Sequence, residues 1–104
     1  MEIFELTNSF PKEEKYSLTD QIRRSSRSVT ACIAEAWARR RYEKSFINKL
    51  TDSLGEEFET ETWLDYSKDC KYISEEIHKR LTSEYAEVRK ILISMLNNSD
   101  KWCV

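Results

Sequence analysis

Apolar and small residues recur every three or four positions along most of the chain, a spacing that predicts a bundle of long helices. The first long stripe consists of Leu18, Ile22, Ser25, Val29, Ile33 and Ala36. It predicts a helix over residues 18–40. Ser17 or Thr19 could cap its start, because either hydroxyl can accept a hydrogen bond from a free backbone N–H.

Two further stripes follow. The first predicts a helix over 43–66 with its core face formed by Phe46, Leu50, Leu54, Phe58 and Leu64. Gly55 lies inside this helix, where we expect it to allow close approach of another helix. The second stripe runs from Ile77 to Met95 and begins after Ser74, a favourable cap. Residues 67–73 form the turn between them, and Trp102 in the tail could fold back onto the bundle.

The chain begins with a short helical segment over residues 2–8, which ends before Pro11. With only one glycine and one proline among 104 residues, sheets and irregular loops are disfavoured. We therefore expect one all-α domain over residues 1–104, an antiparallel up-and-down four-helix bundle with a shortened first helix.

The helix over 18–40 carries small residues on a second face as well, including Ser28, Ala31 and Cys32. This favours packing against a second subunit, although serine and alanine could also simply fill an exposed face. Glu35 shares this face and would need a partner if buried. Arg23 or Arg24 of a neighbouring subunit is the candidate. The predicted oligomer interface comprises Ser28, Ala31, Cys32 and Glu35.

The charges are segregated along the chain. Residues 15–49 carry a net charge of +6, and residues 50–66 carry −6. These blocks can neutralise each other, or they can leave a basic face for a polyanion. The candidate nucleic-acid-binding residues form two groups, one near the start and one at the end of the helix: Arg23, Arg24 and Arg27, then Arg39, Arg40, Arg41 and Lys44.

No pattern of residues points to an enzyme. His78 is the only histidine and has no neighbours at metal-ligand spacing, so no metal or cofactor is expected. Glu57 and Glu61 lie one turn apart, a spacing ordinary for a solvated helix face. The odd number of widely spaced cysteines, with no secretory signal or membrane-length apolar stretch, favours a reduced, cytoplasmic protein.

Several segments resemble the bacterial proteins of the 23S rRNA intervening-sequence family, also called S23. They are FPKEEKYSLTDQIRRSSRSV (10–29), CIAEA (32–36), ETETWLDYSKDCKYIS (59–74) and YAEVRKILISMLNNSDKW (85–102). The resemblance implies a four-helix bundle that assembles as a homopentamer. It also extends to the accessory variability determinant of diversity-generating retroelements, which implies a reverse transcriptase and nucleic acid as partners.

Two departures from the family pattern stand out. The family's Asn-Ile-Ala-Glu-Gly is replaced by Cys32-Ile33-Ala34-Glu35-Ala36, and the first helix is abbreviated. A short first helix predicts an apolar groove that is partly open or covered by another subunit. Two functions follow as hypotheses. One is a non-enzymatic oligomer that binds RNA or DNA or assists a nucleic-acid enzyme. The alternative is a protein-interaction scaffold without nucleic-acid binding.

Overall fold

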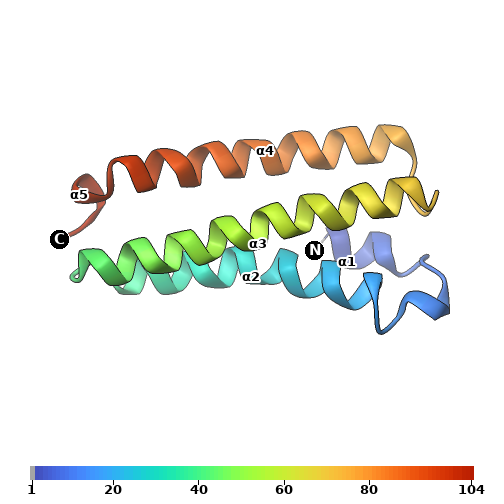
Figure 1. The fold of residues 1–104 in the computed structure, drawn as a ribbon, viewed down its shortest axis with the longest axis horizontal. Coiled ribbons are helices and arrows are strands. Elements are labelled where there is room, and N and C mark those ends of the chain that lie inside the picture. Colours follow the sequence, from blue (N-terminus) through green and yellow to red (C-terminus); the bar gives the residue numbers. More distant parts are fainter. Residues whose placement is uncertain (1) are drawn as a thin grey trace.

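The structure is a computed structural model that describes residues 2–104, all of whose regular elements are helical. In chain order these are α1 (Glu2–Thr7), the 3-10 turn η1 (Lys12–Glu14), α2 (Leu18–Ala38), α3 (Glu43–Asp69), α4 (Glu75–Asn97) and α5 (Ser99–Trp102). The three long helices run up and down in alternating directions, and α1 is a stub (Figure 1). The predicted all-α bundle with a shortened first helix is confirmed.

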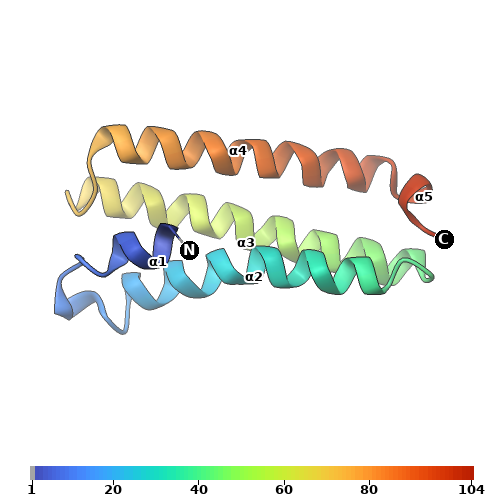
Figure 2. The same ribbon diagram turned by 180° about the vertical axis from the view of Figure 1, so that it is seen from behind.

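α3 is the central element. Both α2 and α4 pack along it, whereas the backbones of α2 and α4 do not approach each other closely within the part of the chain that the structure describes. α1 lies beside the first half of α2, so that Glu2 lies near the middle of the bundle, and the chain ends beside the α2–α3 turn (Figure 2). The position of a full fourth helix is therefore filled at one end only.

The apolar core is divided into two clusters. One lies near α1 and consists of Ile3, Phe10, Leu18, Ile22, Leu64, Ile73 and Leu81. The other lies towards the α2–α3 turn and consists of Ala36, Phe46, Leu50 and Leu92. Since apolar burial is the main stabilising contribution to such a fold, these clusters hold the three helices together.

A polar layer separates the two clusters. Ser53 Oγ donates to the carbonyl oxygen of Val29 at 2.8 Å, and Thr60 Oγ1 donates to Ser25 Oγ at 2.9 Å. All of these side chains except Val29 are fully buried. Hydrogen bonding satisfies their hydroxyls, which lets α2 and α3 approach closely through small residues without an unpaired polar group at these contacts.

The helix boundaries differ from prediction by a few residues. α3 continues to Asp69, beyond the predicted end at residue 66, and the turn follows at Lys71, whose backbone is left-handed with φ of 64°. Ser74 caps α4 as predicted, because its Oγ accepts a hydrogen bond from the N–H of Ile77 at 3.1 Å. Ser17 precedes α2, but its hydroxyl donates to Glu14 and does not cap the helix.

One prediction for the core face of α3 was wrong. Phe58 is 48% exposed and packs beside the guanidinium of Arg89, because the core-facing stripe passes through Glu57 instead. Around Gly55, no atom of another element lies within 4 Å of an added Cβ, so no helix of residues 2–104 approaches it, and its predicted role in close helix approach stays a prediction for a second subunit. The prediction for the tail was correct, since Trp102 packs edge-on against Trp37 with ring centroids 6.3 Å apart.

Candidate nucleic-acid interface

Four cations gather where α2 ends and α3 begins, and we call Arg39, Arg40, Arg41 and Lys44 the turn cluster. The guanidinium of Arg40 stacks 3.6 Å from the Trp37 ring centroid, and its Nε donates to the carbonyl oxygen of Trp37 at 3.0 Å. Arg39 donates to Ser45 Oγ at 3.2 Å. None of the four forms an ion pair among residues 2–104.

Exposed aromatic rings accompany the turn cluster. Trp37 is 48% exposed and Tyr42 is 66% exposed. A shallow hollow of about 380 Å³ lies between them, lined also by Arg40, Arg41 and Val104. The N–H of Val104 donates to the carbonyl oxygen of Arg40 at 3.2 Å, which fixes the end of the chain beside this hollow. Cations next to exposed rings can contact phosphates and stack on bases at the same place.

Arg23 and Arg27, by contrast, hold α1 in position. Arg23 Nε donates to Thr7 Oγ1 at 2.7 Å, and its Nη2 donates to Asn8 Oδ1 at 3.0 Å. Both guanidinium groups stack on Phe4, at 4.3 Å for Arg23 and 5.3 Å for Arg27. Arg23 is therefore largely committed to the fold.

Arg24 is neutralised by the acidic segment of α3. It lies 3.0 Å from a carboxylate oxygen of Glu59 and 3.8 Å from one of Glu56. The two charge blocks therefore do pair across helices, as one of the sequence alternatives expected, but only at this arginine among the seven candidate cations. The turn cluster remains without carboxylate partners.

The predicted oligomer interface lies along the α2–α3 seam. Ser28 and Cys32 are half-buried, and Ala31 and Glu35 are exposed. Glu35 pairs with Lys49 of α3 at 2.7 Å, and the hydrogen bond with Lys49 lowers the pKa of the Glu35 carboxyl. Glu35 thus has a partner in its own chain. Sequence reasoning missed it because the match depends on how α2 and α3 are aligned.

Glu57 is the polar residue that sequence reasoning placed least well. Its side chain is completely buried within the polar layer, and neither carboxylate oxygen has a hydrogen-bond partner in the described chain. Burial, reinforced by the nearby Glu61, raises the pKa of Glu57 to about 8. A signal was available, because Glu57 lies seven residues from both Leu50 and Leu64, at the centre of the core stripe.

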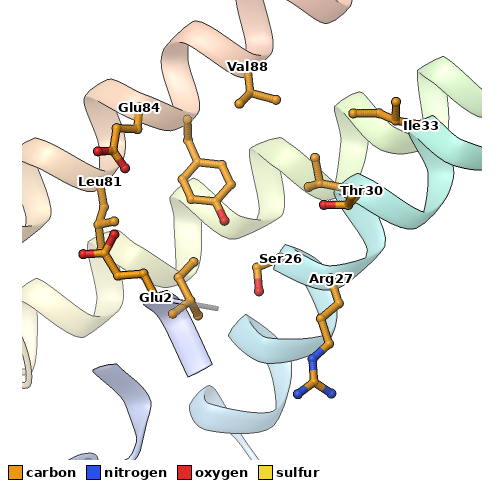
Figure 3. A pocket seen from close by; sticks show the side chains of 11 residues that line it. Glu2, Ser26, Arg27, Thr30, Ile33, Leu81, Glu84 and Val88 are labelled. Carbon is orange, nitrogen blue, oxygen red and sulfur yellow. The ribbon is translucent and has the colours of Figure 1, made fainter. Parts of the chain in front are cut away.

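An open groove lies between α2 and α4, beyond the first residues of α1. Its volume is about 570 Å³. Figure 3 shows side chains of α2, including Thr30 and Ile33, on one side and those of α4, including Leu81 and Val88, on the other. This is the partly open apolar groove expected from the shortened first helix. Within residues 2–104 no helix covers it.

No three His, Cys, Asp or Glu side chains among the described residues converge as metal ligands. The one histidine, His78, lies 2.7 Å from Asp65. All three cysteines are free thiols, and Cys70 is exposed. Within residues 2–104 no helix has the length and apolar character needed to cross a membrane.

Comparison with known proteins places the chain in a family. Residues 1–94 match the family described as 23S rRNA-intervening sequence protein. The structure also resembles the crystal structure of a protein of unknown function from the S23 ribosomal protein family of Bacteroides thetaiotaomicron VPI-5482. That protein is 34% identical, with a TM-score of 0.83 over 92% of this chain and 86% of the other. No curated protein matches. This four-helix-bundle chain therefore belongs to the 23S rRNA-intervening sequence protein family.

Proposed function

We propose that this protein is a non-enzymatic, homo-oligomeric bundle that binds RNA or DNA through the turn cluster. One observation supports this above all. Four adjacent cations lack carboxylate partners, whereas the acidic segment of the same chain already pairs with Arg24. Phosphate contacts by such cations give affinity that does not depend on sequence.

The neighbouring aromatic residues support single-stranded or looped nucleic acid as the ligand. Tyr42 and Trp37 are exposed beside Arg40 and Arg41, and a base stacked on such a ring contributes about 1–3 kcal/mol. The family name refers to 23S rRNA, so a structured RNA with unpaired bases is the first probe. A homopentamer would repeat the site around a ring, and multivalent contact would strengthen weak binding.

The test is a fluorescence-anisotropy titration with a labelled RNA hairpin carrying an unpaired tail and with duplex DNA, at low and physiological salt. We expect RNA binding that weakens with salt. Arg41→Ala should reduce the slope of log binding constant against log salt concentration by the amount of about one phosphate contact per site. Arg24→Ala is the matched control, since Arg24 is already ion-paired. Absence of binding at low salt, or equal effects of the two variants, would contradict the proposal.

The second candidate function is a scaffold for a protein partner, such as a nucleic-acid enzyme of the reverse-transcriptase class. The open groove between α2 and α4 favours it. The two candidates use different parts of the molecule, because the α2–α3 turn that carries the turn cluster is at one end of the bundle, away from α1 (Figure 1), and the groove is lined by the first residues of α1.

A further inference from the structure

The groove continues the path of a helix that is already bound there. α1 lies in the same channel between α2 and α4, and it buries Ile3 and Thr7 against the bundle. Glu2 and Ile3, at its first turn, also line the groove. The channel therefore accepts a helix at one end, and no helix of residues 2–104 occupies the groove that continues it.

The vacant part has the dimensions of a helix contact. It extends from Leu81 to Val88 on α4 and from Ser26 to Ile33 on α2, which is about two helical turns on each wall. Apolar side chains line most of it, and the hydroxyls of Ser26 and Thr30 lie on the α2 side (Figure 3). An amphipathic helix with apolar residues at i, i+3 or i+4, and i+7 matches such a channel.

The two rims carry opposite charges. Arg27 lies on the α2 side, and Glu2 and Glu84 lie across the groove from it (Figure 3). Glu2 and Glu84 share Arg80, with Glu84 3.6 Å from its guanidinium. Arg27, in contrast, lies over the Phe4 ring and has no ion-pair partner among residues 2–104. A complementary helix would place a carboxylate against Arg27 and a cation near Glu84.

We propose that this groove binds an amphipathic helix of a protein partner, with an apolar stripe, an acidic flank against Arg27 and a basic flank against Glu84. The inference deepens the second candidate function and does not depend on nucleic-acid binding. The bound helix would complete the four-helix bundle by packing on α2 and α4 at once. It would bridge α2 and α4, whose backbones do not approach each other closely in residues 2–104.

Two designed peptides of about 15 residues, long enough to form a helix on their own, test the proposal. Both carry a leucine stripe and a fluorescent label. The mixed peptide has glutamate on one flank and lysine on the other, and the basic peptide has lysine on both. Reversing a helix exchanges its flanks, so the mixed peptide can place glutamate against Arg27 in one of its two directions. The comparison therefore does not require the direction of the bound helix to be known.

By anisotropy titration we expect saturable binding, with wild-type protein preferring the mixed peptide. Arg27→Glu should reverse that preference by several-fold, because both rims are then acidic. Thr30→Arg, inside the groove, should weaken both peptides by about tenfold through steric blockage and loss of apolar contact. Thr51→Arg, at an exposed position on α3 outside the groove, is the matched control and should change neither affinity.

Circular dichroism confirms that each variant is folded before titration. No peptide binding, or equal effects of Thr30→Arg and Thr51→Arg, would overturn the proposal. Sedimentation without peptide gives a further test. If Thr30→Arg lowered the mass of the protein, the proposal would also be overturned, because the groove would then be occupied by a second copy of the chain. Repeating the RNA titration with Thr30→Arg separates the two functions, since we expect it to be unchanged.

Discussion

At the scale of single residues, Glu57 is the side chain whose surroundings least suit its ionised form. It is fully buried, no group of the described chain donates a hydrogen bond to its carboxylate oxygens, and Glu61 lies one turn away. From α4, Tyr85 and Arg89 face it, and Arg89 is bound to Glu61 at 2.8 Å. Burying the ionised carboxylate is costly, so the folded protein favours the protonated group.

This makes stability depend on pH. Because the pKa of Glu57 rises from 4.5 to about 8 on folding, the folded protein holds a proton that the unfolded chain releases. As the pH rises from 4.5 towards 8, the free energy of unfolding should fall by up to about 1.4 kcal/mol per pH unit. Above pH 8 this loss of stability should level off, because Glu57 is then ionised in the folded protein as well. Glu57→Gln should remove that slope, as chemical denaturation from pH 5 to 9 would show.

Glu87→Gln, at an exposed position on α4, serves as the control for the loss of one carboxyl group. Its curve should run parallel to that of the wild type. If Glu57→Gln also gave a parallel curve, Glu57 would be ionised in the folded protein and the explanation based on burial would fail.

Gly55 offers a second test at this scale. It lies inside α3 with open space around it. Gly55→Ala should raise the free energy of unfolding by about 0.5–1 kcal/mol, because alanine loses less conformational entropy in a helix. Thermal or urea denaturation measures this. A loss of stability, or a smaller oligomer, would instead show that another subunit packs against Gly55.

At the scale of elements, periodicity predicted α2 and α4 well because each has one dominant apolar stripe. α3 was harder. It contacts helices on two sides, and its buried face includes Ser53, Glu57 and Thr60, so apolar spacing alone did not identify that face. Phe58 attracted the prediction by its size, whereas the register set by Leu50 and Leu64 turns it outwards. The extension of α3 beyond residue 66 was missed because its buried residue there, Ser67, is also polar.

The start of α4 is the boundary that sequence predicted best, and its cap can be measured. Ser74→Ala removes the acceptor for the N–H of Ile77 and should lower the free energy of unfolding by about 1 kcal/mol. Ser83→Ala, at an exposed position within the same helix, is the control and should be neutral or slightly stabilising. Equal effects in urea denaturation would show that the cap contributes nothing.

At the scale of the whole molecule, the pairing of distant charges was the least predictable feature of the candidate sites. The sequence shows which residues are charged but not which of them meet. Only the packing of α2 on α3 brings Arg24 to Glu59 and Glu35 to Lys49. The groove was predictable because a short first helix cannot cover three long ones. Its charged rims depend on the arrangement in space.

Assembly remains a prediction at this scale. If the small-residue face of α2 is a subunit interface, Glu35→Ala should reduce the mass measured by sedimentation, because it changes the charge and shape of the surface that the second subunit would contact. Glu87→Ala, which removes an exposed ion pair with Lys90 on α4, is the control. Exposed pairs contribute little to folding, about 0–1 kcal/mol, so both variants should remain folded. An unchanged mass would argue against this interface.

The one-sided attachment of α4 has a kinetic consequence. The backbone of α4 packs closely along α3 but not along α2, so α4 can separate locally while α2 and α3 stay together. Its amide hydrogens should then exchange with solvent faster than those of α2, as measured by hydrogen–deuterium exchange. Such an opening would also admit water to Glu57, whose ionisation favours the open form. Alkaline solution should therefore increase the population in which α4 is detached.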